Sequence, residues 1–279
     1  MLSELLRVGP GPVDLSSIDP RSTPGLSRKK ATKEWTRDAL VDLDAELADQ
    51  QERLYAAAKA TGTSDRILLV LQAMDCGGKD GTIKHVVGAM NPQGTRITAF
   101  GRPTKEELDH HFLWRIKRAL PVPGQVGVFN RSHYEDVLIV RVHNLVPART
   151  WRARYQQINR FERELTAQGV TVVKVMLHIS YAEQGARLLA RLDDPTKRWK
   201  YNPDDVAERG RWDDYQAAYA DALTRCGEQP WFVVPADRKW YRNWAVTNLL
   251  IEALRGLDLE YPPAKFDVAA ERDRVLRSQ

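Results

Sequence analysis

Five short apolar runs recur along the chain, and each is separated from the next by a segment long enough to form a helix. The runs are residues 67–72 (ILLVLQ), 95–100 (TRITAF), 125–130 (QVGVFN), 170–179 (VTVVKVMLHI) and 231–236 (WFVVPA). Nearly continuous apolar strands with helical crossovers are typical of a parallel sheet that is buried on both faces. The sequence therefore predicts an α/β fold on a five-stranded parallel sheet. Ligands of such sheets bind beyond the carboxyl ends of the strands, so the residues that follow the runs are the first candidates for a site.

The 279 residues are enough for one large domain, which we expect over residues 34–262. Residues 1–33 predict an extended N-terminal arm, because proline, glycine, serine and threonine dominate much of this segment. Leucines at helical spacing then predict a long amphipathic helix that ends at Gly62. Residues 263–279 would form a C-terminal tail.

The composition limits the compartment and the partners. No stretch approaches the roughly 18 apolar residues that cross a bilayer, and the N-terminus does not have the pattern of a signal peptide. Two cysteines, Cys76 and Cys226, cannot form a disulfide framework, so we expect a cytoplasmic protein and no membrane partner. The net charge of +5 permits an anionic partner without identifying one.

The first run leads into a glycine-rich loop, residues 73–82 (AMDCGGKDGT). Backbone N–H groups at such a strand-to-helix turn bind phosphate, and Lys79 adds a positive charge on the phosphate that is transferred. The loop departs from the pattern G-x-x-x-x-G-K-[ST], because Ala73 has the first glycine position and Asp80 has the hydroxyl position. We expect phosphate to be bound by Cys76, Gly77, Gly78, Asp80, Gly81, Thr82 and Lys84, with Lys79 as a catalytic residue.

Two aspartates in this loop, Asp75 and Asp80, bear on the cofactor. A carboxylate beside a polyanion is unfavourable unless a cation lies between them. Either these side chains point away from the phosphate, or the loop binds Mg²⁺ that bridges carboxylate and phosphate oxygens, with Mn²⁺ as a second candidate.

A second group of polar residues follows the third run, in residues 129–143 (FNRSHYEDVLIVRVH). Arg131 can contact phosphate oxygens with two nitrogens, and Glu135 or Asp136 can complete a metal site. The alternative is a surface salt bridge of little energetic value between Arg131 and Glu135. Asn130, together with Arg102 after the second run, is a candidate for contacts with a nucleotide.

A third group is basic, in residues 195–202 (PTKRWKYN), which contain Lys197, Arg198 and Lys200. The group lies between two helix-like segments, which predicts a lid over about residues 193–212. Such a lid would exclude water and bind a phosphate chain. The alternative is a charged face that only contacts solvent.

Four segments together resemble the second family of polyphosphate kinases, in the same order and at similar spacing. They are residues 74–86, 129–143, 193–205 and 235–246. The resemblance implies a P-loop kinase fold similar to thymidylate kinase, with a three-layer sandwich and a helical lid. It also implies phosphoryl transfer between inorganic polyphosphate and a nucleotide in the presence of Mg²⁺.

By that resemblance Asp75, Lys79 and Arg131 would form the catalytic core, Asp75 and Asp136 would hold the metal, and the basic lid would bind polyphosphate. The pattern Asn-Arg-Ser-x-Tyr-Glu-Asp is similar to the subgroup called class III, whose members are associated with both nucleoside monophosphates and diphosphates. The implied reactions are AMP to ADP and ADP to ATP, reversibly, on purine nucleotides, by a homodimer or homotetramer.

Two other functions remain compatible with the residues. One is an ATP-dependent nucleoside monophosphate kinase of the same fold, since a basic lid also suits the phosphates of ATP. The other is a module that binds polyphosphate or nucleic acid without catalysis. The clustered carboxylates argue against nucleic acid, whose backbone favours cations and aromatic residues without acids between them.

Overall fold

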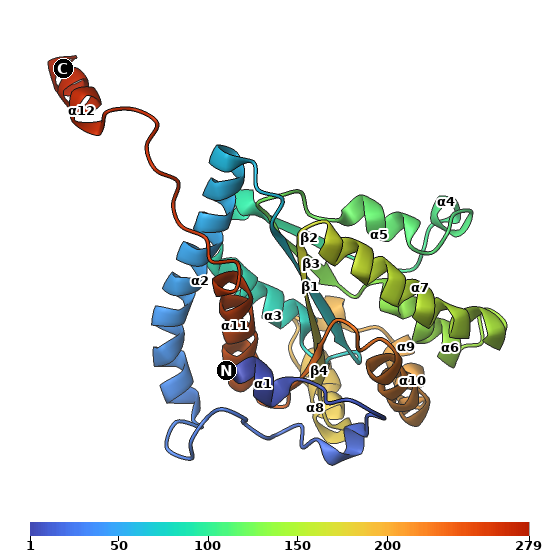
Figure 1. The fold of residues 1–279 in the computed structure, drawn as a ribbon. Helices are drawn as coiled ribbons and strands as arrows, with labels where there is room; N and C mark the ends of the chain where they lie inside the picture. Colours follow the sequence, from blue (N-terminus) through green and yellow to red (C-terminus); the bar gives the residue numbers. More distant parts are fainter. Residues whose placement is uncertain (279) are drawn as a thin grey trace.

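The five predicted runs are the five strands of one parallel sheet, as the computed structural model of the chain shows for residues 1–278 (Figure 1). The strand order is β2-β3-β1-β4-β5. The strands are β1 (Arg66–Ala73), β2 (Thr95–Ala99), β3 (Val126–Asn130), β4 (Val170–His178) and β5 (Trp231–Pro235). The predicted α/β class and the parallel sheet are confirmed.

Helices connect the strands and cover both faces of the sheet. The α-helices are α1 (Leu2–Leu6), α2 (Lys33–Thr61), α3 (Lys79–His85), α4 (Lys105–Leu108), α5 (Trp114–Ala119), α6 (Ile139–Val142), α7 (Ala148–Ala167), α8 (Tyr181–Asp193), α9 (Asp204–Arg209), α10 (Trp212–Arg225), α11 (Lys239–Arg255) and α12 (Val268–Arg277). Short 3₁₀ turns are η1 (Leu15–Ser17), η2 (Val87–Ala89), η3 (Pro92–Gly94), η4 (His133–Val137) and η5 (Arg198–Lys200).

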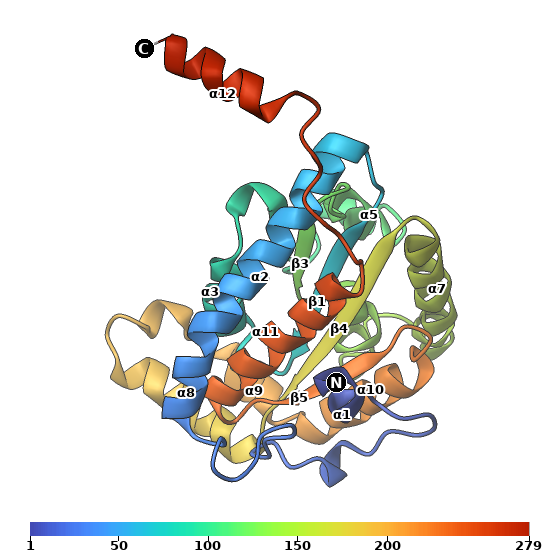
Figure 2. The ribbon, with the colours of Figure 1, turned by 60° about the vertical axis from the view of Figure 1, so that its left-hand side comes forward.

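The central strand β1 separates two hydrophobic cores, because successive side chains of a strand point to opposite faces. Leu69 and Leu71 pack in the core that contains α1, α2 and α11. Leu68 and Val70 pack in the core that contains α5, α7 and α10. The molecule is therefore a three-layer sandwich, with α2 and α11 on one side and α7 on the other (Figure 2).

The long helix α2 has clear signals at both ends. The side chain of Thr32 caps its start by accepting a hydrogen bond from the N–H of Trp35 at 3.2 Å. Gly62 follows its end with a φ of +70°, a left-handed conformation that glycine adopts at little cost. The helix therefore ends where the sequence predicts.

The N-terminal segment is extended for most of its length, but it is docked along the body of the protein. Leu6 is buried in one core and Leu15 in the other. Val8 donates a backbone hydrogen bond to Trp231, so the segment lies along the edge strand β5. The domain boundaries at residues 34 and 262 remain a prediction.

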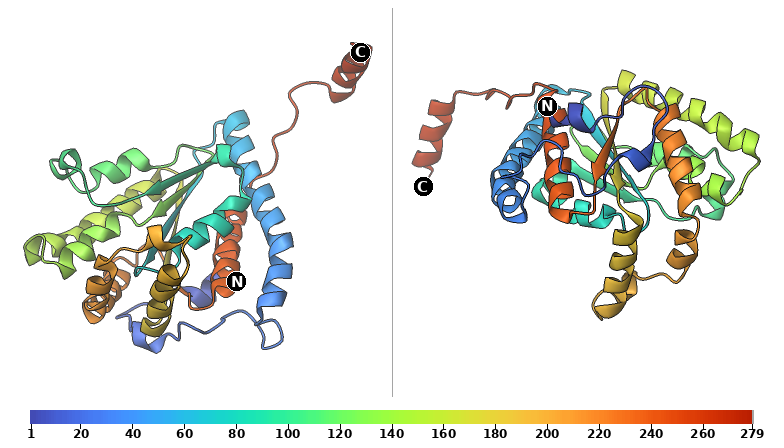
Figure 3. Two further views of the ribbon diagram at one scale, coloured as in Figure 1. Left: turned by 180° about the vertical axis from the view of Figure 1, so that it is seen from behind. Right: turned by 90° about the horizontal axis from the view of Figure 1, so that it is seen from below.

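Two segments project from the sandwich. The hairpin of α8, η5 and α9 extends beyond the carboxyl ends of the strands, where a lid was predicted (Figure 3). The C-terminal helix α12 stands away from the body with its side chains exposed (Figures 1 and 2). Within residues 1–278, no helix combines the length and the apolar character that crossing a bilayer requires.

Candidate active site

The glycine-rich loop after β1 turns sharply into α3. Gly78, at the N-terminus of α3, has a φ of +109°, which side-chain-bearing residues rarely adopt. A Cβ atom added at Gly78 would lie 2.0 Å from Nη1 of Arg242, so the arginine side chain would have to move. The loop thus brings its backbone and the N-terminus of α3 to the carboxyl end of the sheet, as a phosphate site requires.

Lys79 is buried at this turn. Its Nζ donates a 2.8 Å hydrogen bond to the carbonyl oxygen of Ala73 at the end of β1. Burial lowers the pKa of Lys79, and the neighbouring Arg131 lowers it further, while Asp75 acts in the opposite direction. An anionic ligand in contact with this amine would therefore stabilise its charged form.

Arg131 connects the ends of two neighbouring strands. It follows β3, has a φ of +63°, and donates a 2.7 Å hydrogen bond from Nη2 to Oδ1 of Asp75. Beside it, Nδ2 of Asn130 donates to Oδ1 of Asp80 at 2.8 Å. Asp80 therefore points toward Asn130, and only Asp75 of the two loop aspartates pairs with an arginine.

Glu135 lies behind Arg131 and is half-buried. Burial raises the pKa of its carboxyl group, although the positive charges of Arg131 and Lys79 oppose this effect. With its amide nitrogen directed at Glu135, Gln72 donates a 3.0 Å hydrogen bond to Oε1, while the amide oxygen accepts from the N–H of Ser132. Gln72 on β1 thus holds Glu135 toward the cations.

A cavity of about 1100 Å³ lies over the loop and under the lid. It is open between the glycine-rich loop, the end of β3, the lid and the start of α11. The predicted site residues that line it are Asp75, Cys76, Gly77, Gly78, Lys79, Asp80, Gly81, Asn130, Arg131, Lys197 and Lys200. Most of the predicted phosphate-binding loop is therefore at one surface.

Other predicted residues lie elsewhere. Thr82 is fully buried and its hydroxyl donates to the carbonyl oxygen of Gly78, and Lys84 is exposed outside the cavity. Arg198 turns away from the cavity, because its Nε donates to the carbonyl oxygen of Leu192. Arg102 lines a neighbouring cavity of about 520 Å³ beyond the end of β2.

The structure does not bring Asp136 together with Asp75, contrary to the prediction that they hold one metal. Asp136 does not line the cavity, and its Oδ1 pairs with Nη1 of Arg154 on α7 at 2.9 Å. The cause is the 3₁₀ turn η4, in which successive side chains point in different directions. Glu135 faces the cations of the site, and Asp136 faces α7.

Two arginines that were not predicted individually lie against the loop. Arg187 on α8 donates a 2.9 Å hydrogen bond from Nη1 to the carbonyl oxygen of Cys76. Arg242 on α11 is 3% exposed, and no carboxylate among residues 1–278 forms an ion pair with it. Burial and the proximity of Arg187 lower the pKa of Arg242 to about 10. A buried cation without an acidic partner is costly, so this position favours an anionic ligand.

Asp205, from the start of α9 in the lid, also lines the cavity. It is 9% exposed and lies 3.3 Å from Nη1 of Arg191. Burial raises the pKa of Asp205, and the negative charge of Asp75 raises it further. In the part of the chain that the structure describes, no three His, Cys, Asp or Glu side chains form a metal site by themselves.

The sequence contained weak signals for these residues. Arg242 and Asp205 lie within two of the segments that carry the family resemblance, residues 235–246 and 193–205. Their positions at the cavity depend on how α11 and the lid fold back over the loop, and residue spacing does not specify this.

The chain is similar to several characterised proteins. A sequence model described as polyphosphate kinase 2 matches residues 30–261. An AMP/ADP-polyphosphate phosphotransferase from Meiothermus ruber is 46% identical over 92% of this chain and 94% of its own length. An ADP-polyphosphate phosphotransferase from Rhodopseudomonas palustris is 41% identical over 92% of this chain and 91% of its own length. The crystal structure of polyphosphate kinase 2 from Arthrobacter aurescens TC1 has a TM-score of 0.94 and 53% identity, covering 99% of this chain and 96% of that one.

Proposed function

The chain belongs to the polyphosphate kinase 2 family and is a polyphosphate-dependent nucleotide kinase, and we propose that it transfers the phosphoryl group at the glycine-rich loop after β1. Its fold is that of a P-loop kinase. One observation carries the location of the site: Asp75, Lys79 and Arg131 converge at the carboxyl ends of β1 and β3, in a cavity that is rich in cations.

Polyphosphate binds along the cations of this cavity in our proposal. Arg242 and Arg187 lie against the loop on one side, and Lys197 and Lys200 face it from the lid. Guanidinium groups match phosphate oxygens with paired donors, and lysines add point charges. The exposed lysines of the lid contact polyphosphate when the lid is closed. Arg242 already lies against the glycine-rich loop.

The residues present fit a divalent metal ion. Asp75 and Asp205 line the same cavity, and the negative charge of Asp75 raises the pKa of Asp205. Mg²⁺ is usually bound by one or two carboxylates, with substrate phosphates and water completing its shell. We propose that Asp75 and Asp205 hold Mg²⁺, or Mn²⁺, which when bound neutralises charge on the phosphate oxygens.

The protein groups act by positioning and by charge. Arg131 leaves Asp75 and contacts the phosphoryl group that is transferred, while Lys79 contacts the phosphates on the loop side. The attacking oxygen of the nucleotide is already ionised for the most part at neutral pH, since the second pKa of a phosphate is about 6. The reaction therefore requires no strong general base.

The acceptors in our proposal are AMP and ADP, in keeping with the name of the Meiothermus ruber relative. Asn130 places a neutral amide at the cavity, so it does not repel an acceptor phosphate. Arg102 is at the adjoining cavity, where the rest of the nucleotide could extend. The preference for purine bases and the assembly as a homodimer or homotetramer remain predictions.

One assay tests donor and acceptor together. The protein is incubated with Mg²⁺ and AMP or ADP, with either polyphosphate or ATP as the sole donor, and the nucleotide products are separated. We expect ADP and ATP to form from polyphosphate. Product with ATP but not with polyphosphate would favour the ATP-dependent nucleoside monophosphate kinase. No product with either donor would favour a binding module.

A further inference from the structure

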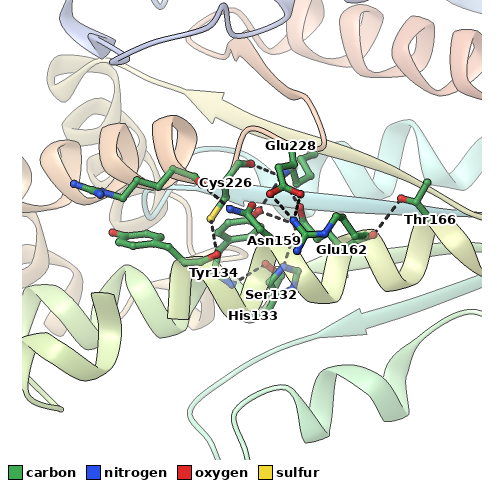
Figure 4. Close-up of polar contacts among 12 residues, drawn as sticks. Ser132, His133, Tyr134, Asn159, Glu162, Thr166, Cys226 and Glu228 are labelled. Atoms are coloured by element: carbon green, nitrogen blue, oxygen red, sulfur yellow. Dashed lines mark hydrogen bonds and ion pairs between the residues drawn. The ribbon is translucent and has the colours of Figure 1, made fainter. Parts of the chain in front are cut away.

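A group of polar side chains is fully buried beneath η4, on the face of the sheet that packs against α7. His133 and Tyr134 come from η4, Glu162 from α7 and Lys174 from the middle of β4, and each is 0% exposed. Figure 4 shows His133, Tyr134 and Glu162 turned toward one another. We call these four residues the buried polar cluster.

Lys174 connects most of the cluster through hydrogen bonds. Its Nζ donates to Oε2 of Glu162 at 2.7 Å, to the hydroxyl of Tyr134 at 2.9 Å and to the carbonyl oxygen of Cys226 at 2.7 Å. All three donor positions of the ammonium group are therefore used. The charge of Lys174 is compensated without water.

Glu162 receives the two side chains of η4 on its other oxygen. The hydroxyl of Tyr134 donates to Oε1 at 2.7 Å, and Nε2 of His133 lies 3.2 Å from the same atom. Burial alone would raise the pKa of Glu162, but Lys174 and His133 outweigh it and lower the pKa. Glu162 therefore stays ionised and contacts the His133 and Tyr134 side chains of η4.

Active-site residues lie on the other side of the chain at η4 and just before it. Asn130 and Arg131 face the cavity and Glu135 faces the cations behind it, whereas His133 and Tyr134 point into the protein. The backbone of Arg131 is left-handed, a conformation that persists only where the surroundings hold it. The cluster holds the chain at His133 and Tyr134, two and three residues beyond this strained position.

Stability alone does not account for such a cluster. A buried ion pair can often be replaced by apolar residues of similar size without loss of stability, because removing two charges from water costs about as much as their attraction returns. The neighbouring positions of β4 on the same face are Val172 and Met176, so apolar residues fit this layer. An apolar pair in place of Glu162 and Lys174 could not fix the direction of the Tyr134 hydroxyl and the His133 ring.

We propose that the buried polar cluster is a positioning device, in which Glu162 and Lys174 fix η4 through Tyr134 and His133 and thereby hold Arg131 and Glu135 in place for phosphoryl transfer. The inference rests on the proposed function of the cavity. None of the four residues reaches the cavity, so they act through the turn and not on the substrate.

Tyr134→Phe tests the proposal with the smallest change, since it removes one hydroxyl and keeps the ring. We expect kcat with polyphosphate and ADP to fall by about tenfold to a hundredfold, the scale of loss from a misplaced catalytic group. The KM values for polyphosphate and ADP should change less than about twofold, because the binding cations of the lid, α8 and α11 do not depend on η4.

Tyr155→Phe is the matched control. Tyr155 is a buried tyrosine of the same core, on α7, and its hydroxyl contacts Arg141 instead of η4. We expect this variant to keep the wild-type kcat. An equal fall of kcat in both variants would overturn the proposal, because it would indicate a general response of the core.

The double variant Glu162→Leu/Lys174→Met separates positioning from folding. We expect a folded protein with the reduced kcat of Tyr134→Phe, and no further loss when all three substitutions are combined. A kcat per folded molecule equal to wild type, in Tyr134→Phe or in a folded double variant, would overturn the proposal. If the double variant does not fold, Tyr134→Phe and its control decide alone.

The same measurements keep this proposal apart from the proposed function. Absence of polyphosphate-dependent transfer in the wild-type protein would contradict the function itself. Full transfer in both wild type and Tyr134→Phe would leave the function intact and overturn only the role of the cluster.

Discussion

Arg131 and Asp75 form a 2.7 Å ion pair that joins the carboxyl ends of β3 and β1. In the proposed reaction both partners have other uses, since Asp75 binds the metal ion and Arg131 contacts the transferred phosphate. In the proposed reaction this pair would keep both charges compensated until substrate binds.

Replacing either central group of the loop should abolish transfer. We expect Asp75→Asn and Lys79→Ala to lower kcat by about a thousandfold or more, the scale of loss of a group that stabilises the transition state. Circular dichroism and thermal melting should show a folded protein in each case. Asp38→Asn, an exposed change on α2 outside the cavity, serves as the control. Turnover like that of wild type in either loop variant would contradict the mechanism.

Arg242→Met should weaken polyphosphate binding and stabilise the protein. The side chain is a buried cation without an acidic partner among the described residues, so removing its charge relieves a cost of folding. We expect the KM for polyphosphate to rise about tenfold, consistent with loss of a charged contact, and the melting temperature without ligand to stay equal or increase. Arg255→Met changes an exposed arginine of the same helix and should alter neither quantity. A lower melting temperature with an unchanged KM would assign Arg242 a structural role.

The dependence of the reaction rate on Mg²⁺ concentration distinguishes Asp205 from Asp136 as a metal ligand. We expect Asp205→Asn to raise the Mg²⁺ concentration for half-maximal rate by about tenfold, because one charged ligand becomes neutral. Asp136→Asn should leave this concentration unchanged, since Asp136 pairs with Arg154 outside the cavity. The opposite result would restore the ligand pair that the sequence suggested.

Asp136 should instead affect how stability depends on pH. Burial raises the pKa of Asp136 from 3.8 to about 6, and Arg154 offsets only part of this effect. The folded state then holds a proton that the unfolded state has already lost, so stability falls as the pH rises from about 4 to about 6. The contribution is at most about 3 kcal/mol. Compared with Asp136→Asn, the wild type should lose relative stability across this window in urea titrations. Parallel curves for the two proteins would contradict the prediction.

The strands and the phosphate loop could be predicted from sequence because their signals are local. Continuous apolar runs define β1 and β4, and Gly78 and Lys79 lie in the loop that leaves β1. The carboxyl ends of parallel strands meet at one edge, which is why Arg131 could be expected beside Asp75.

The remaining residues of the site depend on contacts between distant segments. Glu135 and Asp136 are adjacent, and only the geometry of the 3₁₀ turn decides which of them faces the cations. Arg242 reaches the loop from α11, and Asp205 reaches it from the lid. The sequence shows that these residues are charged, but it does not show which residues they contact in the folded protein.

The docking of the N-terminal segment has a consequence for folding in the cell. The backbone N–H of Leu2 donates to Glu252, a residue 250 positions away, and Val8 pairs with β5 near the end of the chain. Such contacts between distant residues form late, because they close a very long loop and need a partner that is synthesised much later. Leu2 and Val8 are thus among the last residues to reach their native contacts. Until they do, the newly made edge of β5 is open to pairing with another nascent chain.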